Sequence, residues 1–164
     1  MERTAILSPD GLYRYSLGRE WNTQRPSVMF VMLNPSKADV FIDDTTITKC
    51  IGFAQRWEFG GLIVVNLYAF RATLPSDLWR SPYDPRGPEN DKYISLLASK
   101  PARVVCAWGN HAYRDRADSV TRLLLQTRSG VFLPNELYCL GKTNSGAPRH
   151  PVRLPYNTQL EVYR

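Results

Sequence analysis

The chain has 164 residues, a length that suits one domain with a sizeable core, so we expect a single domain over residues 1–164. Its formal net charge of +6 at pH 7 favours a polyanionic partner such as nucleic acid. No apolar run reaches the length of a signal peptide core or a membrane span. We therefore expect a cytoplasmic protein with no membrane partner, and the sequence indicates no oligomeric state.

Cysteine and histidine are few and scattered. Cys50, Cys106 and Cys139 lie in apolar segments without a Cys-x-x-Cys pair, which is typical of buried, reduced thiols in a cytosolic protein. The two histidines have no close ligand partners in the sequence. We expect no metal site and no cofactor.

The first half of the chain predicts two strands and a helix. Residues 12–17 alternate apolar and polar side chains, with Tyr13, Tyr15 and Leu17 on one face, as in an edge strand. Residues 28–33 are all apolar, which predicts a strand buried on both faces, and this run ends at Asn34-Pro-Ser. Residues 43–46 are suited to capping a helix over residues 47–57.

The next strand, residues 62–65, leads into Asn66 and Tyr68. A proline-rich stretch from Pro75 to Pro88 then predicts a long irregular connection over the surface, of the kind that is often functional or mobile. A helix is expected from there to Ala98.

The second half predicts two further strands. Residues 104–108 are predicted to form the third buried strand, after residues 28–33 and 62–65, and lead to Asn110 and His111. The helix after it, residues 113–124, carries Arg114, Arg116 and Arg122 on a face that we expect to be solvated. Residues 137–140 suit a fourth strand that opens into a basic, glycine-rich loop, residues 141–151.

Strands that alternate with helices predict an α/β fold, a three-layer sandwich around a mostly parallel sheet of about four strands. The carboxyl ends of parallel strands meet at one edge of the sheet, where such folds bind ligands. We therefore expect one pocket that combines the polar residues after the strands, which are Asn34, Asn66, Asn110, His111 and His150.

The chemistry of these residues suits a neutral heterocycle or a sugar phosphate. Asparagine amides both donate and accept, histidine can stabilise a developing anion, and Lys142, Arg149 and Arg153 can hold phosphates. The chain lacks a Gly-x-Ser-x-Gly elbow, which argues against a serine hydrolase. Gly141-Lys-Thr is not a phosphate-binding loop, because that motif needs a glycine where Glu136 stands.

Structural roles remain open for several of these residues. Asn34 can simply form a turn, and His150 can pack beside a rigid proline turn. Asp39, Asp43 and Asp44 are each better suited to capping than to acid catalysis.

The chain resembles a bacterial and phage family without an assigned reaction, domain of unknown function 1643 (DUF1643). The resemblance spans nearly the whole chain and rests on Tyr13-Arg-Tyr-Ser-Leu, Phe30-Val-Met-Leu-Asn-Pro-Ser-Lys-Ala-Asp39, Asp43-Asp-Thr-Thr-Ile47, Val65-Asn-Leu-Tyr-Ala-Phe-Arg-Ala-Thr73, Gly87-Pro-Glu-Asn-Asp91, Ala107-Trp-Gly-Asn110 and Leu140-Gly-Lys-Thr-Asn-Ser-Gly-Ala-Pro-Arg-His-Pro151.

Four segments are also similar, in order, to motifs of mismatch-specific uracil-DNA glycosylases: Met32-Leu-Asn-Pro-Ser36, Val64-Val-Asn66, Ala107-Trp-Gly109 and His150-Pro151. The chain departs from those motifs at Ser36 and after Pro151, where Val152-Arg-Leu follows. The resemblance implies a uracil-DNA glycosylase-like fold in which Asn34 orients the attacking water, Asn66 reads a base edge and His150 stabilises the departing base.

The expected function is hydrolysis of an N-glycosidic bond at a modified or mismatched base in nucleic acid. We expect the catalytic residues to be Asn34 and His150, and the substrate-binding residues to be Asn66, Tyr68, Asn110, His111, Lys142 and Arg149. The partner is then a nucleic acid, DNA in the first place, or a nucleotide-like ligand. Two alternatives stay open: a non-catalytic nucleic-acid or nucleotide-binding module, and an enzyme acting on free nucleosides or nucleotides.

Overall fold

The all-apolar run forms the central strand of the sheet. The computed structural model describes residues 1–129 and 135–164, and in it β3 (Ser27–Met32) lies between β4 (Gly61–Asn66) and β5 (Arg103–Cys106), parallel to both. Every residue from Val28 to Met32 is buried. The prediction of a strand buried on both faces is therefore confirmed.

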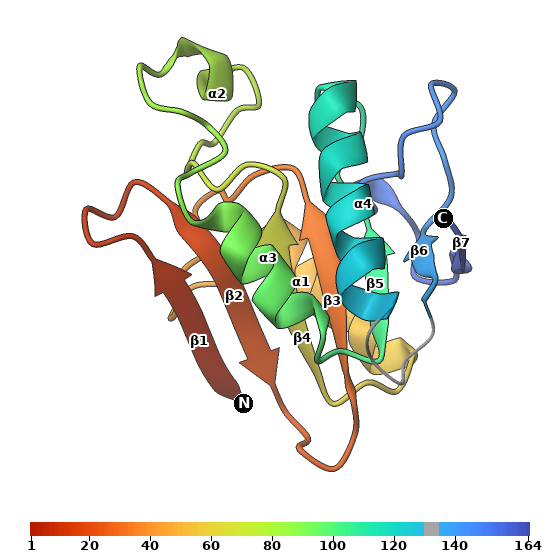
Figure 1. Cartoon of the computed structure of the whole chain (residues 1–164). Coiled ribbons are helices and arrows are strands. Elements are labelled where there is room, and N and C mark those ends of the chain that lie inside the picture. Colours follow the sequence, from red (N-terminus) through yellow and green to blue (C-terminus); the bar gives the residue numbers. More distant parts are fainter. Residues whose placement is uncertain (130–134) are drawn as a thin grey trace.

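Helices cover both faces of the sheet (Figure 1). α3 (Asn90–Ala98) and α4 (Arg114–Ser129) lie side by side on one face, and α1 (Thr45–Arg56) lies on the other. Consecutive side chains of β3 point to opposite faces, so Met29 belongs to the core under α3 and α4, and Phe30 to the core under α1. The α/β class predicted from the sequence is confirmed.

The sheet differs from the expected one in size and direction. It has seven strands in the order β1-β2-β4-β3-β5-β6-β7, where the outer strands are β1 (Glu2–Leu7), β2 (Arg14–Glu20), β6 (Leu137–Cys139) and β7 (Glu161–Val162). Three neighbouring pairs are antiparallel, namely β1 with β2, β2 with β4 and β6 with β7. The prediction of about four mostly parallel strands is wrong because β1 has no buried residue and β7 has only two residues, both exposed, so neither edge strand carries a strong apolar signal.

The strand predicted at residues 12–17 is not an edge strand. It is β2, which lies between β1 and β4. Its pairing with β1 shifts register next to Tyr15, and as a result Tyr15 stacks on Tyr93 of α3 whereas Leu17 packs in the core under α1. The prediction that these two side chains share a face is wrong.

Arg116 of α4 is buried rather than solvated. Only 7 % of the residue is exposed. Its Nε donates to the Leu67 carbonyl at 2.8 Å, and its Nη2 lies 2.6 Å from Asp91 of α3. The arginine therefore ties α4 to α3 and to the segment after β4.

Three further features complete the architecture. The proline-rich connection contains one short helix, α2 (Asp77–Arg80), and a 3-10 helix, η1 (Pro151–Arg153), follows His150. Cys50, Cys106 and Cys139 are buried and form no disulfide. None of the described helices has the length and apolar character needed to cross a membrane.

Candidate functional site

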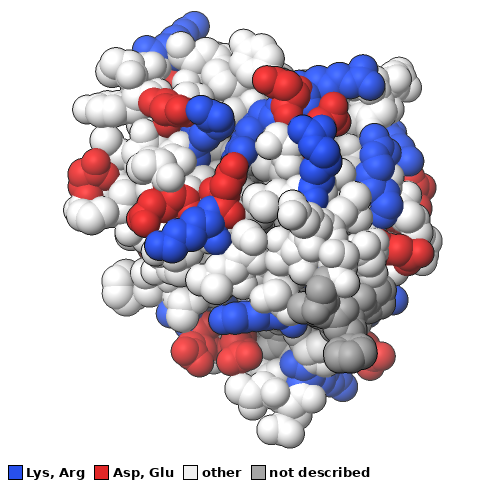
Figure 2. Space-filling model, viewed as in Figure 1, with Lys and Arg blue, Asp and Glu red and all other residues white. Residues whose placement is uncertain are grey.

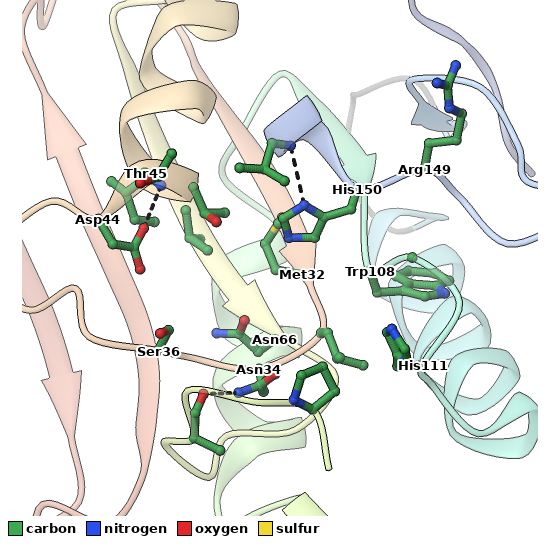
Figure 3. A pocket seen from close by; sticks show the side chains of 18 of the residues that line it. Met32, Asn34, Ser36, Asp44, Thr45, Asn66, Trp108, His111, Arg149 and His150 are labelled. Carbon is green, nitrogen blue, oxygen red and sulfur yellow. Dashed lines mark hydrogen bonds between the residues drawn. The ribbon is translucent and has the colours of Figure 1, made fainter. Parts of the chain in front are cut away.

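A cavity of about 620 Å³ opens where β4, β3, β5 and β6 end (Figure 3). Its lining includes the polar residues that follow these strands: Asn34, Asn66, Asn110, His111 and His150. The structure thus brings together the five residues that the sequence analysis placed in one pocket. Their chemical roles stay predictions.

Asn66, the last residue of β4, is the most deeply buried polar residue of this group. It is 1 % exposed, and neither its amide nitrogen nor its amide oxygen has a hydrogen-bond partner among the described residues. Its backbone carbonyl is held by the Asn90 amide at 2.9 Å. Because buried polar groups are almost always paired, an anchored and unpaired amide in a cavity wall is suited to binding a ligand.

Asn34 is fixed by two carbonyl groups. Its Nδ2 donates to Pro35 at 3.0 Å and to Ala72 at 2.7 Å, in the segments that follow β3 and β4. Since both neighbours are acceptors, the nitrogen must face them, and Oδ1 is the atom that can accept from a ligand or a water. Asn34 therefore has the turn-forming role considered above and also presents an acceptor.

His150 lies half-buried at the start of η1. Its Nδ1 accepts from the Val152 backbone nitrogen at 3.3 Å, so in the neutral ring the proton is on Nε2, which faces away from Val152 (Figure 3). Burial lowers the pKa of His150 below its ordinary value, although the Asp44 carboxylate opposes that shift. At neutral pH the imidazole is an uncharged donor.

The loop before His150 is fastened to the end of β5. The Gly109 nitrogen donates to the Pro148 carbonyl at 2.9 Å, and Oδ1 of Asn110 accepts from the hydroxyls of Thr143 and Ser145 at 2.7 and 2.8 Å. Gly109 has a φ of +75°, a conformation that side chains other than glycine rarely adopt. Asn110 thus holds the loop that positions His150.

Three of the expected binding residues do not point into the cavity. Tyr68 is buried and does not belong to the lining, and its hydroxyl accepts from the Tyr113 nitrogen at 3.2 Å. Lys142 is exposed and lies outside the lining, with Nζ 5.8 Å from the centre of the Tyr163 ring. Arg149 contributes to the lining, but its guanidinium extends away from Asn66 and His150 (Figure 3).

The sequence analysis missed other residues of the lining. Asp44 caps α1 by accepting from the Ile47 nitrogen at 2.9 Å, and it is the one carboxylate among the lining residues that the structure describes. Arg14 reaches the cavity from β2. The capping pattern around residue 44 marked the start of a helix without showing that it faces the site, and a lone arginine in an alternating strand gives no signal at all. Hydroxyl groups of the lining come from Ser36, Thr45, Thr46, Thr73 and Thr143.

Nothing in the described part of the chain gathers three His, Cys, Asp or Glu side chains closely enough to hold a metal ion. The lining residues offer amides, hydroxyls, two imidazoles, an indole and three guanidinium groups, of which that of Arg14 is buried. This set suits hydrogen bonding to an organic ligand.

Comparison with known proteins gives a match to a family. The model of a family described as proteins of unknown function, DUF1643, matches residues 14–152. This span contains all the residues that line the cavity except two, Arg153 and Leu154, which follow it directly. No curated protein and no solved structure matches the chain.

Proposed function

The chain belongs to the DUF1643 family, and from its site we propose that it hydrolyses the N-glycosidic bond of a nucleobase in nucleic acid. The observation that carries the proposal is the buried, unpaired amide of Asn66 in the wall of a cavity that also holds an uncharged His150. A uracil-DNA glycosylase-like arrangement of these residues is part of the same proposal.

Asn66 is suited to reading a base edge. Its amide offers a donor and an acceptor side by side, which matches the adjacent acceptor and donor of a lactam such as uracil. An amide that pairs with both groups discriminates between bases by about 1–3 kcal/mol. A base lacking one of these groups leaves a buried amide atom unpaired, and this cost provides the selectivity.

His150 is suited to stabilising the departing base. As the bond between the sugar C1′ and the base nitrogen breaks, the bonding electron pair moves onto the base, and Nε2–H can donate to the oxygen where this charge gathers. A neutral donor is the better choice here, because it stabilises the anion without first having to be protonated. The base then takes up a proton and leaves.

Asn34 is suited to placing the nucleophile. Its amide does not titrate, so it acts by position: Oδ1 accepts from a water whose oxygen adds to C1′, and the proton that this water loses passes to solvent. The sugar gains a hydroxyl and the base gains a hydrogen, which balances the hydrolysis.

The direct test is a panel of oligonucleotides carrying uracil, mismatched and hypermodified bases, treated with alkali to cleave at abasic sites. We expect product from at least one of them. Asn34→Ala and His150→Ala should each slow the reaction by about a hundredfold or more, as when a positioned catalytic contact is lost. Asn144→Ala is the matched control, since Asn144 is exposed on the same loop and outside the cavity lining.

Two other results would replace the proposal. Release of base only from free nucleosides or nucleotides would identify an enzyme of small molecules. Binding of oligonucleotides without base release, unchanged by Asn34→Ala and His150→Ala, would identify a binding module. Polymer binding should weaken steeply with added salt because phosphate contacts release counterions.

The surface charge indicates where a nucleic-acid strand would contact the protein. On the face formed by α3 and α4, Lys and Arg are interspersed with Asp and Glu (Figure 2). This face therefore lacks a continuous basic stripe, and we place the contact with nucleic acid at the edge of the sheet around the cavity.

A further inference from the structure

Arg14 brings a buried positive charge to the cavity wall. The residue is 2 % exposed and reaches the cavity from β2. Its Nη1 donates to the Ala38 carbonyl, while its Nε is buried and has no hydrogen-bond partner among the described residues. Burial lowers the pKa of Arg14 to about 10, so the guanidinium still carries its charge at neutral pH.

The other buried arginine of β2 is paired differently. Arg19 is 1 % exposed, and its Nε donates to the Asp43 carboxylate at 2.8 Å. Among the described residues, no carboxylate lies within ion-pair distance of Arg14, and Asp44 and Asp39 raise its pKa only from a longer distance. A buried charge is costly unless it is paired, so the position of Arg14 suggests a partner that the chain itself does not supply.

The wall next to Arg14 is made of further groups that favour an anion. The first turn of α1, a helix of 12 residues, contributes Thr45 and Thr46, and Ser36 adds a further hydroxyl to the lining. The positive end of a helix dipole stabilises negative charge there. Asp44 is the exception, but one of its oxygens is engaged in capping Ile47.

This anion-favouring wall lies beside the base-reading amide. Figure 3 shows Ser36 and Thr45 on one side of Asn66, with His111 and Trp108 on the other. A cavity of about 620 Å³ falls within the range of about 300–1,000 Å³ that is typical of sites for small organic ligands. A base on Asn66 can therefore carry a phosphorylated sugar towards the wall formed by Arg14 and α1.

We propose that Arg14, assisted by the hydroxyls of Ser36 and Thr45, binds a phosphate group, so that the ligand is a phosphorylated nucleoside rather than a free base or nucleoside. The identity of the nucleoside part rests on the proposed function. Of the three cations that were expected to hold phosphates, Lys142 lies outside the lining, Arg149 extends away from Asn66 and His150, and Arg153 lines the cavity but is exposed. This assignment therefore moves phosphate recognition to a buried residue of β2. The phosphate belongs either to a free nucleotide or to a nucleic-acid strand.

The test compares ligands that differ only in the phosphate. Affinities of the four common nucleosides and of their 5′-monophosphates are measured by calorimetry for the natural protein, Arg14→Gln and Arg14→Lys. We expect at least one monophosphate to bind about 10- to 100-fold more tightly than its nucleoside, as charge-assisted bonds to a phosphate would give. Arg14→Gln should abolish the difference, and Arg14→Lys, which keeps the charge without the planar fork, should keep part of it.

Controls separate this proposal from the function on which it rests. Arg114→Gln is the matched variant, because Arg114 is exposed and lies outside the cavity lining. Ser36→Ala tests the same site if Arg14→Gln does not fold. An oligonucleotide that binds more tightly than every monophosphate identifies a strand as the source of the phosphate, and the reverse order identifies a free nucleotide.

Inorganic phosphate is the last probe. If it raises the melting temperature of the natural protein but not of Arg14→Gln, while no nucleoside or nucleotide binds through Asn66, the anion site stands and the proposed function fails. The opposite result has two parts: nucleosides bind through Asn66 with the same affinity as their monophosphates, and inorganic phosphate has no effect that depends on Arg14. In that case the proposed function stands and this inference is wrong.

Discussion

Asn66 and Asn90 are equally buried, but their amides are used differently. Within the described part of the chain, Asn66 has no partner for either amide atom, whereas Nδ2 of Asn90 donates to the carbonyls of Asn66 and Leu67 at 2.9 and 3.2 Å. We expect Asn66→Leu to raise the free energy of unfolding by about 1 kcal/mol, because it removes an unsatisfied buried amide of nearly the same size. The same substitution should abolish base binding.

Asn90→Leu is the matched control. It removes two hydrogen bonds and should lower the free energy of unfolding by about 2 kcal/mol. Chemical denaturation of the two variants beside the natural protein measures both effects. A loss of stability in Asn66→Leu as large as that in Asn90→Leu would mean that the Asn66 amide is structural.

His150 makes the stability depend on pH. Burial lowers its pKa in the folded protein, so below about pH 6.5, the ordinary value, the unfolded chain binds more protons than the folded one. Above that pH the neutral ring makes its full contribution to the free energy of unfolding. This contribution is lost as the pH falls through the pKa that His150 has in the folded protein. We expect the melting temperature to fall less between pH 7 and pH 5 in His150→Gln than in the natural protein.

A variant without a titratable group provides the comparison for this measurement. Asn144 is exposed and outside the cavity lining, so Asn144→Ala should keep the slope of melting temperature against pH that the natural protein has. The carboxylates whose pKa values hydrogen bonds lower, such as Asp39, act in a lower range of pH. Equal slopes for all three proteins would show that His150 is not protected from protonation in the fold.

Prediction from sequence succeeded for residues that follow buried strands and failed for those that reach the cavity from elsewhere. Asn34, Asn66 and Asn110 stand after apolar runs, and the direction of parallel strands brings them to one edge. Arg14 belongs to an antiparallel strand whose place beside β4 depends on pairing between distant segments. No local pattern carries that information.

At the scale of elements, Gly52 determines how the segment after His150 docks on α1. A Cβ atom at Gly52 would lie 2.4 Å from the Tyr156 hydroxyl. The Tyr156 ring cannot easily move aside, since it packs edge-on against Phe53 and lies under Lys49 and Arg56, 3.9 and 3.8 Å from its centre.

We therefore expect Gly52→Ala to lower the free energy of unfolding by about 1–3 kcal/mol, the usual cost of overpacking. In most helices the same change is stabilising by up to about 1 kcal/mol. Thermal unfolding of a double-mutant cycle with Tyr156→Ala measures the difference. In the Tyr156→Ala background Gly52→Ala should stabilise the protein, and a loss of equal size in both backgrounds would contradict the explanation.

The positions of the helices in the sequence were easier to predict than which of their charged side chains are buried. Residues 43–46 correctly marked the start of α1, because capping is a local interaction of Asp44 with its own helix. Arg116 was expected in solvent because the pattern on α4 does not show that α3 brings Asp91 beside it. Charged residues bury when a partner from another element pairs with them, and this pairing is not visible in one helix.

At the scale of the whole molecule, the centre of the sheet follows from the sequence and its edges do not. β3, β4 and β5 are apolar runs whose burial on both faces can be read directly. β1 has no buried residue, both residues of β7 are exposed, and these two strands form because β2 and β6 offer unpaired backbone groups. Both edge strands also lie outside the residues that match the family.

The three buried cysteines lie in three different elements, Cys50 in α1, Cys106 in β5 and Cys139 in β6. Burial raises the pKa of each thiol, so the native protein should react very slowly with a thiol reagent. The rate of labelling then measures how often each part opens. We expect all three to be modified together when unfolding is global, as counted by mass spectrometry of partly labelled protein.

A molecule with one or two labels would instead identify a region that opens alone. Early modification of Cys139, for example, would show that β6 and β7 detach from β5 while the remainder stays folded. A ligand that binds the cavity should slow the global reaction in proportion to its occupancy. The chain's own sulfur atoms thus allow a search for the unknown ligand by reaction rate alone, without any assay of its chemistry.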